Sequence, residues 1–436
     1  MNRITKISIT VALAGFLFGF DTVVISGADE QLQELWKTTD FFHGTFIMSM
    51  ALWGTVLGAI LANYPCDKFG RKKTLIWIGI FYFISALGSG LATEPYIFSF
   101  FRFIGGLGVG ASTVAAPTYV SEIAPSSQRG RLVALYQFNI VLGILIAFIS
   151  NYLLNDVGAQ PWRWMVGIEA LPALIYTILV FGVPNSPRWL LSKRKDLDGA
   201  RLVYLELHGQ DFDASLLETN KNEIKFSNRF FSKTYRFPIL LAFLIAFFNQ
   251  LSGINAFLYY APRIFKSAGL DQSASLLSSI GIGITNLLFT ILGVYLIDRL
   301  GRKTLMYFGS IGYIVSLSMV GMAFLFSWQG VIVPAFLFLF IASHAIGQGA
   351  VIWVFISEIF PTNLRAKGQS FGSSTHWVLA ALITLFMPLA LGSFSNPGYV
   401  FLFFAFMMIF QLLFVSFMMP ETKGVSLEKL QELLRK

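Results

Sequence analysis

Asp67-Lys-Phe-Gly-Arg-Lys-Lys73 is a burst of charge between two long apolar runs. It returns as Asp298-Arg-Leu-Gly-Arg-Lys303, again between two apolar runs, with the acidic residue, the glycine and the basic residues at the same spacing. A pattern that recurs at the same place in two halves of a chain is an internal repeat. Two similar halves in an apolar chain are typical of membrane transporters, so the sequence predicts a two-fold plan.

Composition places the chain in a membrane. Of its 436 residues, 55% are hydrophobic and 13% are charged, whereas soluble domains carry about 25% charged residues. High counts of Phe (45) and Gly (38) are typical of helices that pack closely in lipid. The single cysteine, Cys66, excludes an intramolecular disulfide. Because the first apolar run continues as a full span without a small-residue cleavage site, we expect no cleavable signal.

Apolar runs long enough to cross a bilayer, about 20 residues each, indicate an all-α membrane protein with twelve transmembrane helices. A polar segment, residues 185–236, divides them six and six, and we expect it to form short helices at the membrane surface. The predicted domains are therefore 1–184, the linker 185–236, 237–419 and a tail, 420–436. The expected spans are 7–28, 43–63, 74–93, 97–120, 132–154, 164–184, 237–260, 273–297, 304–326, 332–356, 369–390 and 399–419.

The basic residues predict the orientation. With both termini in the cytoplasm, roughly 27 Lys and Arg residues lie in cytoplasmic segments and about 4 in external ones, a strong positive-inside bias. The net charge of +9 is then a topology signal with anionic lipid headgroups as its partner, which argues against nucleic-acid binding. The external basic residues are Lys37, Arg163, Arg263 and Lys266.

Two ionisable residues lie within spans, where charge is costly: Asp21 in the first and Arg102 in the fourth. Pairing would favour the charged carboxylate, while apolar burial would favour the neutral acid. A carboxylate under these opposed influences suits a proton-coupled pump, although a static ion pair that fixes packing explains the residues equally well. Gly106 and Gly110 follow Arg102 at i+4 and i+8, and we expect them to let another helix approach closely.

Neutral amides recur in the fifth, seventh and eighth spans. Because an amide both donates and accepts hydrogen bonds, five of them favour a hydroxyl-rich ligand over hydrogen bonding between helices alone. Ser252-Gly253 and Pro262 predict that the seventh span is interrupted, which is typical of a binding site at a transporter's midplane. The five amides are Gln137, Asn249, Gln250, Asn255 and Asn286.

Aromatic residues add a possible shelf for a sugar ring. Gly349 and Trp353 are i, i+4 in the tenth span and share a face, although Trp353 could simply be core. His376-Trp377 in the eleventh span adds a hydrogen-bonding ring and a second indole. Four His residues without paired spacing exclude a metal site. The nucleophile elbow, the zinc-protease motif and the phosphate loop are all missing, so we expect no enzyme and no cofactor.

These residues together resemble the sugar porter family of the major facilitator superfamily, which includes bacterial proton:monosaccharide symporters and facilitative glucose transporters. The resemblance covers nearly the whole chain and implies two six-helix bundles around a central cavity. Its motifs, in order, are Gly19-Phe-Asp-Thr-Val-Val-Ile-Ser-Gly27, Asp67–Lys73, Arg102-Phe-Ile-Gly-Gly106, Tyr119-Val-Ser-Glu-Ile-Ala-Pro125 with Arg129-Gly-Arg131, Val183-Pro-Asn-Ser-Pro-Arg-Trp189, Asn249-Gln-Leu-Ser-Gly-Ile-Asn255 with Tyr259-Tyr-Ala-Pro262, Asp298–Lys303, Ser357-Glu-Ile-Phe-Pro361 with Arg365, and Pro420-Glu-Thr-Lys-Gly424.

The resemblance also implies roles for single residues. Asp21 matches the aspartate of proton-coupled members, with Arg102 as its partner and Glu169 as an assistant. Charged residues at helix ends would form a cytoplasmic gate, although plain topology signalling also explains the basic ones: Asp67, Arg71, Glu122, Arg129, Asp298, Arg302, Glu358 and Arg365. The positions of sugar contacts are Gln137, Gln250, Asn255, Asn286, Gly349, Trp353 and Trp377, with Phe18 and Tyr259.

Several residues depart from the family pattern. Asn249 stands where the first of two glutamines is usual, His376 replaces an amide, and Ile144 occupies a position where some members have a second glutamine. These changes line the expected pocket and leave the sugar open. Asn185 replaces the usual Glu before Ser186, and the stretch Ala62-Asn-Tyr-Pro-Cys-Asp67, which leads into the first charged repeat, is unusual for the family. Both changes concern the gate.

The leading hypothesis is a monosaccharide transporter for a hexose or pentose, working by proton symport with alternating access as a monomer in a bacterial inner membrane. A uniporter of the same fold is the first alternative. A sugar sensor is a second, but sensors tend to carry long cytoplasmic tails, and the segment after Pro420 is short.

Overall fold

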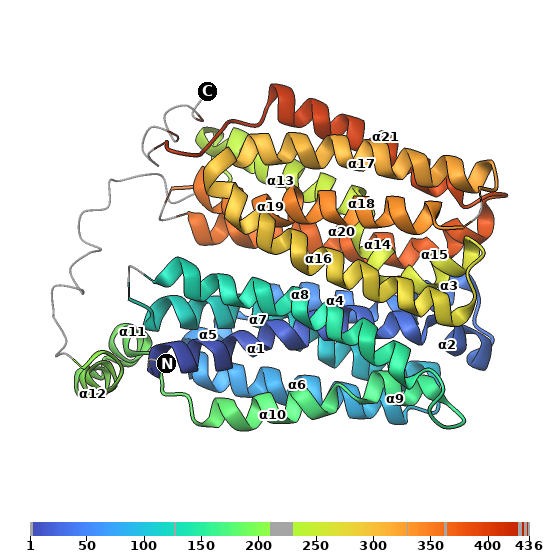
Figure 1. Ribbon diagram of the computed structural model, residues 1–436. Coiled ribbons are helices and arrows are strands. Elements are labelled where there is room, and N and C mark those ends of the chain that lie inside the picture. The colour runs from blue at the N-terminus through green and yellow to red at the C-terminus, as the bar shows by residue number, and fades with distance from the viewer. Residues whose placement is uncertain are drawn as a thin grey trace. The chain divides into compact units, whose positions relative to one another are not determined.

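The structure, a computed structural model, describes residues 3–125, 128–209, 230–328, 330–361 and 364–425, together with Leu430 and Leu434. Every regular element in these ranges is helical (Figure 1). Among them, eleven segments are long and apolar enough to cross a membrane. A twelfth span consists of two helical segments, Asp40–Met48 and Met50–Leu61, that meet at a bend of 40°. The predicted fold class, an all-α membrane protein with twelve spans, is confirmed.

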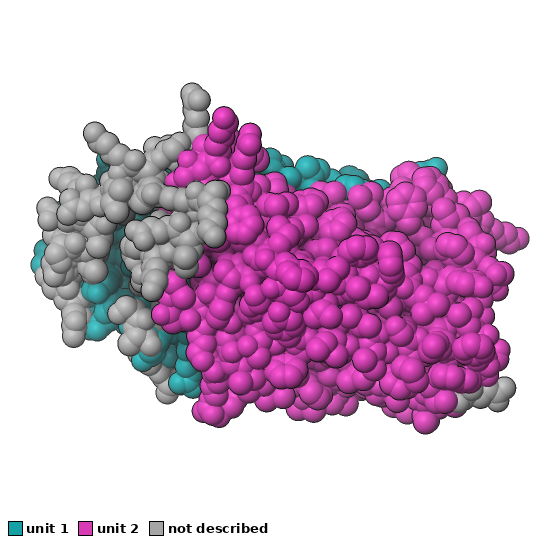
Figure 2. All heavy atoms as spheres, turned by 90° about the horizontal axis from the view of Figure 1, so that it is seen from above, with its two compact units in different colours: residues 1–24, 50–147, 156–226 teal, residues 25–49, 148–155, 227–436 magenta. Residues whose placement is uncertain are grey.

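The chain divides into two compact units, coloured teal and magenta in Figure 2. Unit 1 comprises residues 1–24, 50–147 and 156–226, and unit 2 comprises residues 25–49, 148–155 and 227–436. These units are defined by how the helices pack and not by their order in the chain. The halves 1–184 and 237–419 therefore stay a prediction.

Unit 1 is built on long helices that run side by side, in which α1 and α6 contact each other and each contacts both α7 and α10. Its last helices, within the predicted linker, lie near the start of α1, where Arg3 forms an ion pair with Glu206 (Figure 1). Its elements are α1 (Arg3–Val24), α4 (Met50–Leu61), α5 (Asn63–Phe69), α6 (Arg71–Leu91), α7 (Pro95–Ile123), most of α8 (Arg129–Leu154), α9 (Pro161–Gly167), α10 (Ala170–Phe181), α11 (Pro187–Trp189), the π-helix η3 (Leu190–Arg194) and α12 (Leu197–His208).

Unit 2 holds the remaining spans and the short segment between the first two spans, which was predicted to be external. Within it, α17 packs against both α18 and α21, and α13 packs against α20. Its elements are the 3-10 helix η1 (Ile25–Gly27), α2 (Asp29–Trp36), α3 (Asp40–Phe42), the π-helix η2 (His43–Met48), η5 (Lys233–Tyr235), α13 (Arg236–Leu251), α14 (Ile254–Tyr259), α15 (Ala261–Ser267), α16 (Gln272–Leu300), α17 (Arg302–Leu325), α18 (Ile332–Ile346), α19 (Gln348–Ile359), α20 (Arg365–Ser393) and α21 (Gly398–Phe417).

Small residues set a close helix contact in unit 1. A Cβ added at Gly106 would lie 1.9 Å from the carbonyl oxygen of Ala51, and one at Gly110 would lie 2.2 Å from that of Thr55. Both carbonyls belong to α4, so α4 and α7 approach backbone to backbone. The predicted packing role of these two glycines is confirmed.

The seventh span is interrupted as predicted. The helix α13 ends at Leu251, Gly253 has φ +83°, and α14 and α15 continue the span. Pro262 stands in the first turn of α15, where its missing N–H leaves no helical hydrogen bond unmade. The interruption places Gln250 and Asn255 on either side of a backbone bend.

The tenth span is interrupted too, which the sequence analysis did not predict. The helix α18 ends at Ile346 and α19 begins at Gln348, with Gly347 at φ −84° and ψ −100° between them. A Cβ at Gly347 would lie 2.8 Å from the Cα of Gly309 on α17. The close approach of two backbones therefore bends this span, and it turns Gln348 into the interior of unit 2.

The two copies of the charged repeat adopt the same turn. Gly70, between α5 and α6, has φ +90° and ψ 157°, and Gly301, between α16 and α17, has φ +92° and ψ 164°. Positive φ at such angles is accessible to glycine at little cost. The internal repeat predicted from the sequence is thus confirmed in backbone geometry.

Cys66, in α5, is buried, and burial raises the pKa of its thiol to about 11. The thiolate is the reactive form of cysteine, so this residue is inert at neutral pH.

Alanine at Gly253 is expected to destabilise the protein more than alanine at Gly269. Both glycines have positive φ, but an added Cβ at Gly253 would lie 2.8 Å from the Phe257 ring and 2.9 Å from the Phe404 ring, whereas at Gly269 it would meet nothing within 4 Å. Gly269→Ala should cost about 1 kcal/mol from backbone strain alone, and Gly253→Ala roughly 1–3 kcal/mol more from overpacking. Thermal unfolding in detergent measures the stability of both variants. Equal losses of stability in the two would contradict the packing argument.

Candidate functional site

A buried ion pair joins the first and fourth spans inside unit 1. The Nη1 of Arg102 donates to Oδ1 of Asp21 at 2.5 Å, and its Nη2 donates to the backbone carbonyl of Asp21 at 3.0 Å. Both side chains are about 1–2% exposed. One guanidinium therefore binds a carboxylate and the helix that carries it, so a change in the charge of Asp21 acts directly on the contact between α1 and α7.

A second carboxyl lies beside this pair. Glu169, 1% exposed, stands where α9 ends and α10 begins, and it interacts with both Asp21 and Arg102. Two carboxyl groups beside one guanidinium carry one negative charge in excess, so this arrangement can hold one proton. The three residues that the sequence analysis assigned to proton coupling lie together.

The amides of the interrupted seventh span form a second cluster, in unit 2. The Nδ2 of Asn255 donates to Oε1 of Gln250 at 2.9 Å, and the Nε2 of Gln250 donates to Oδ1 of Asn249 at 3.0 Å. The same Nε2 lies 3.1 Å from the ring nitrogens of His376 on α20. The three amides are buried, and together with the imidazole they supply donors and acceptors of the kind that bind hydroxyl groups.

Aromatic rings surround His376. Its ring centroid lies 5.2 Å from that of Trp353 on α19 and 4.7 Å from that of Trp377, with an interplanar angle of 82° to Trp377. Indole faces beside amides offer an apolar surface and hydrogen bonds in one place, which is the pairing that a sugar presents.

The remaining candidates are less directly connected to this cluster. Asn286 on α16 is buried and accepts a hydrogen bond from Thr290 at 3.4 Å. A Cβ added at Gly349 would lie 3.1 Å from the carbonyl of His344. Tyr259, at the end of α14, is buried. Gln137, Phe18 and Ile144 belong to unit 1.

The charged repeats build two matching sites. In unit 1, Arg71 donates from Nη1 to the Cys66 carbonyl at 3.0 Å and to Asp67 at 3.2 Å, and its Nη2 pairs with Glu122 at 2.9 Å.

In unit 2, Arg302 repeats this arrangement. Its Nη1 donates to the Ile297 carbonyl at 3.2 Å and to Asp298 at 3.0 Å, and its Nη2 pairs with Glu358 at 2.9 Å. In both units, therefore, one arginine joins a turn between two spans to the end of a third helix.

The segment after the last span of each half covers its turn. In unit 1, the indole N–H of Trp189 donates to the Asp67 carbonyl at 2.9 Å, and Lys193 pairs with Asp67 at 2.7 Å.

In unit 2, Thr422 donates to Glu358 at 2.5 Å. Glu421 accepts the backbone N–H groups of Arg302 and Lys303, each at 3.0 Å. Pro420-Glu421-Thr422 corresponds in sequence to Pro184-Asn185-Ser186, so Asn185 stands in the place of Glu421.

Two gate candidates stay predictions. The side chain of Arg129 lies outside the described part of the structure. Arg365 is half-buried at the start of α20.

A buried polar cluster in the external segment was missed by the sequence analysis. His43 Nε2 lies 2.7 Å from Oδ1 of Asp29, both buried, and Arg263 on α15 approaches the other oxygen of Asp29 at 3.5 Å. Lys266 pairs with Glu30 at 2.9 Å. Arg263 and Lys266 had been read only as external charges, yet their spacing opposite Asp29 and Glu30 was a usable signal.

The chain is similar to known proteins over nearly its whole length. Residues 7–434 match the family model described as sugar (and other) transporter. The arabinose-proton symporter of Bacillus subtilis is 33% identical over 445 residues, covering 99% of this chain and 95% of the relative. The glucose transporter GlcP of Staphylococcus epidermidis is 35% identical over 435 residues, covering 97% and 96%.

A solved structure agrees over the same length. The partially occluded, inward-open conformation of the xylose transporter XylE from E. coli has a TM-score of 0.85 and 30% identity, covering 97% of this chain and 99% of that one.

Glu421→Gln is expected to lower the melting temperature near pH 7 but not near pH 3.5. Partial burial would raise the pKa of the Glu421 carboxyl, but backbone N–H groups of Lys423, Arg302, Lys303 and Thr422 outweigh it and hold the pKa below its usual range. A lowered carboxyl pKa adds stability above the unfolded pKa, about 4.3, and this stability is lost as the pH falls through the folded value.

The measurement is thermal unfolding of both proteins from pH 7 to pH 3.5. Exposed Glu94, whose side chain does not cap α7, provides the control variant Glu94→Gln. If the melting temperatures of wild type and Glu421→Gln differ as much at pH 3.5 as at pH 7, the charged carboxylate of Glu421 is not the source of the stability.

Proposed function

The chain belongs to the sugar porter family of the major facilitator superfamily, and from that premise we propose that it carries a pentose or hexose across the membrane together with a proton. It is a transporter and not an enzyme. Relatives of similar identity are named for arabinose, for glucose and for xylose, so the family leaves the choice of monosaccharide open.

The observation that carries the coupling is the buried group of Asp21, Arg102 and Glu169. Two carboxyls against one guanidinium leave one negative charge in excess unless a proton is bound. Protonation of Asp21 would weaken the 2.5 Å contact with Arg102 and release α7 from α1. A proton taken up here would therefore change the packing of unit 1, which is what coupling to a conformational cycle requires.

The sugar site that we propose combines hydrogen bonds with indole surface. Its members in unit 2 are Asn249, Gln250, Asn255, Asn286, Tyr259, Gly349, Trp353, His376 and Trp377. Support comes from the contacts among the seventh-span amides, His376 and the two indoles. Gln137 and Phe18 of unit 1 stay predicted sugar contacts on the strength of the family resemblance.

We further propose that Arg71 and Arg302 belong to a cytoplasmic gate. Each pairs with a largely buried glutamate and with an exposed aspartate of its own turn, Asp67 or Asp298. The exposed pairs contribute only about 0–1 kcal/mol each. Contacts of that strength can form and break within a transport cycle.

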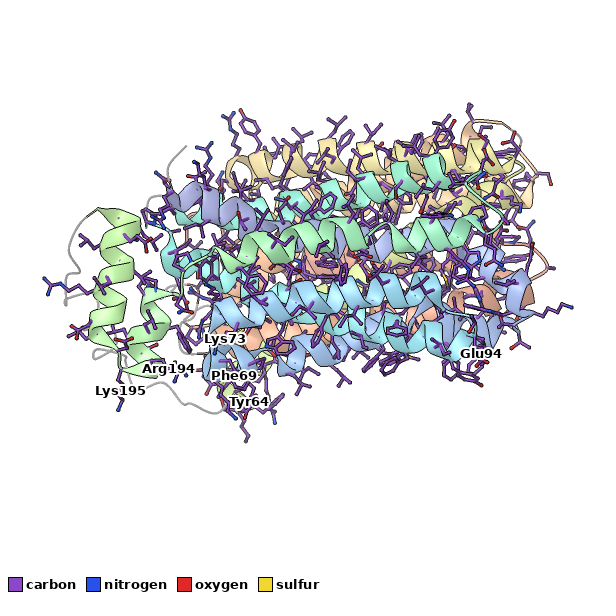
Figure 3. The ribbon with its side chains drawn as sticks, turned by 90° about the horizontal axis from the view of Figure 1, so that it is seen from below. Tyr64, Phe69, Lys73, Glu94, Arg194 and Lys195 are labelled. Carbon is purple, nitrogen blue, oxygen red and sulfur yellow. The ribbon has the colours of Figure 1, made fainter. Side chains whose placement is uncertain are left out.

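The proposed location is the bacterial inner membrane, with both termini in the cytoplasm and the protein acting as a monomer. The distribution of charge in unit 1 supports this orientation. In Figure 3, Lys73, Arg194 and Lys195 lie at one end of its long helices and Glu94 lies at the other. A cluster of basic residues at one end is the positive-inside pattern.

Asp21→Asn tests the coupling. The variant keeps the shape of the side chain but cannot release a proton, so uphill accumulation driven by an imposed pH gradient should collapse while exchange of labelled sugar in counterflow survives. Both are measured in proteoliposomes with D-xylose, L-arabinose and D-glucose. Unchanged accumulation in the variant would instead identify a uniporter, whose transport does not depend on this carboxyl.

Gln250→Ala and Trp353→Ala test the sugar site. A thermal-shift screen of the purified protein against monosaccharides and inositols identifies the ligand, and each variant should abolish the shift that this ligand gives to the wild type. Trp77 is 54% exposed on α6 and absent from the cluster, so Trp77→Ala should retain the shift. A full shift in both site variants would show that the sugar binds elsewhere.

A further inference from the structure

A line of buried polar side chains runs from the lipid-side helices of unit 2 to Gln250. It begins at Ser310 on α17, whose hydroxyl donates to the Met306 carbonyl at 2.7 Å. The Nε2 of Gln411, on α21, donates to Ser310 Oγ at 2.8 Å. The Nε2 of Gln348, on α19, then donates to Oε1 of Gln411 at 3.0 Å. All three side chains are 0% exposed.

The same direction of hydrogen-bond donation continues to the proposed sugar site. The Nδ2 of Asn249 lies 3.5 Å from Oε1 of Gln348, the longest link in the line. Gln250 donates to Asn249, and Asn255 donates to Gln250. Every member thus gives its N–H to the neighbour on the Ser310 side and receives one from the neighbour on the Asn255 side.

Ser310 fixes this sense. Its single proton is used by the Met306 carbonyl, so only its oxygen faces Gln411, and the Gln411 amino group must turn toward it. Turning any amide of the line around would place two amino groups or two carbonyls against each other. In a buried site each such clash leaves polar groups unsatisfied, which costs about 1–3 kcal/mol. The orientation of one amide therefore dictates the next.

We propose that Ser310, Gln411 and Gln348 are positioning residues that set the orientation of the Gln250 amide, and through it the pattern of sugar hydroxyls that the site accepts. The inference rests on the proposed sugar site. None of the three belongs to the residues that the family resemblance assigns to the sugar.

The consequence at the site is a defined polarity. The amino group of Gln250 has two protons, one donated to Asn249 and one toward His376, and its carbonyl oxygen already accepts from Asn255, so only the second lone pair of that oxygen is left to meet a ligand. His376 accepts with one ring nitrogen, and in the neutral ring the other nitrogen carries the proton. Gln250 therefore accepts from a sugar hydroxyl, and His376 donates to one.

Ser310→Ala is the direct test, with Ser316→Ala as its control. Ser316 is also buried on α17 and also donates to the carbonyl four residues earlier, that of Gly312 at 2.6 Å, but it lies outside the line. Transport is measured in proteoliposomes with whichever of D-xylose, L-arabinose and D-glucose has the lowest KM in wild type, and with the monodeoxy derivatives of that sugar. Ser310→Ala should raise KM about fivefold, the effect of one hydrogen bond, at unchanged maximal rate.

A change in selectivity separates positioning from general loosening. In wild type, a deoxy sugar that lacks the hydroxyl donated to Gln250 should have a higher KM than the parent sugar. In Ser310→Ala this difference in KM should shrink, because the Gln250 amide is no longer held in one orientation. Gln411→Leu, which interrupts the line at its next member, should act in the same direction. The proposal is overturned if both variants keep the wild-type KM for the sugar and the wild-type ratio of KM values between each deoxy derivative and the parent sugar.

Gln250→Ala in the same assay keeps two failures apart. If it abolishes transport at low sugar concentration while Ser310→Ala and Gln411→Leu behave as Ser316→Ala, the sugar site stands and the positioning role is wrong. If Gln250→Ala leaves KM unchanged, the sugar site itself is wrong, and the inference falls with it.

Discussion

A charged or polar group inside a membrane must find its partner within the chain, because lipid supplies none. Arg71 and Arg302 meet this constraint in the same way. Each binds a carbonyl and a carboxylate of its own turn and a glutamate on another helix. The turn, the two spans that it connects and the end of a third helix are thereby held together, and the interior clusters of each unit lie within that frame.

The two units use different chemistry in their interiors. Unit 1 buries two carboxyls and a guanidinium, Asp21, Glu169 and Arg102, whose interactions change with one proton. Around the proposed sugar site, unit 2 buries the amides Asn249, Gln250 and Asn255, which carry no charge. The groups proposed for the proton and those proposed for the sugar therefore belong to different units of the chain.

How much of this could be predicted from sequence depended on how local the cause was. The repeated turn and the interrupted seventh span arise from neighbouring residues, Gly70 and Gly301 in one case and Gly253 in the other, and both were predicted. The bend at Gly347 arises from the approach of α17, at Gly309, and the residues next to Gly347 in the sequence did not predict it.

The same distinction holds for the sites. Asp21 and Arg102 were found because charge is rare in a span, and their pairing followed. Gln348 and Gln411 were passed over, since a single amide in a span has no partner until three helices are placed around it. Asp29 and His43 lie 14 residues apart in an external segment whose fold the sequence pattern did not indicate.

The substitution at Asn185 makes the two copies of the repeat unequal. The first turn of α17 gives two N–H groups to the Glu421 carboxylate, whereas α6 starts after Gly70 with no side-chain cap from that residue and with an amide where the corresponding carboxylate would stand. An amide there carries no charge to complement the positive end of the helix dipole. The start of α6 is therefore the weaker of two otherwise equivalent joints, where amide hydrogens exchange first and local opening costs least.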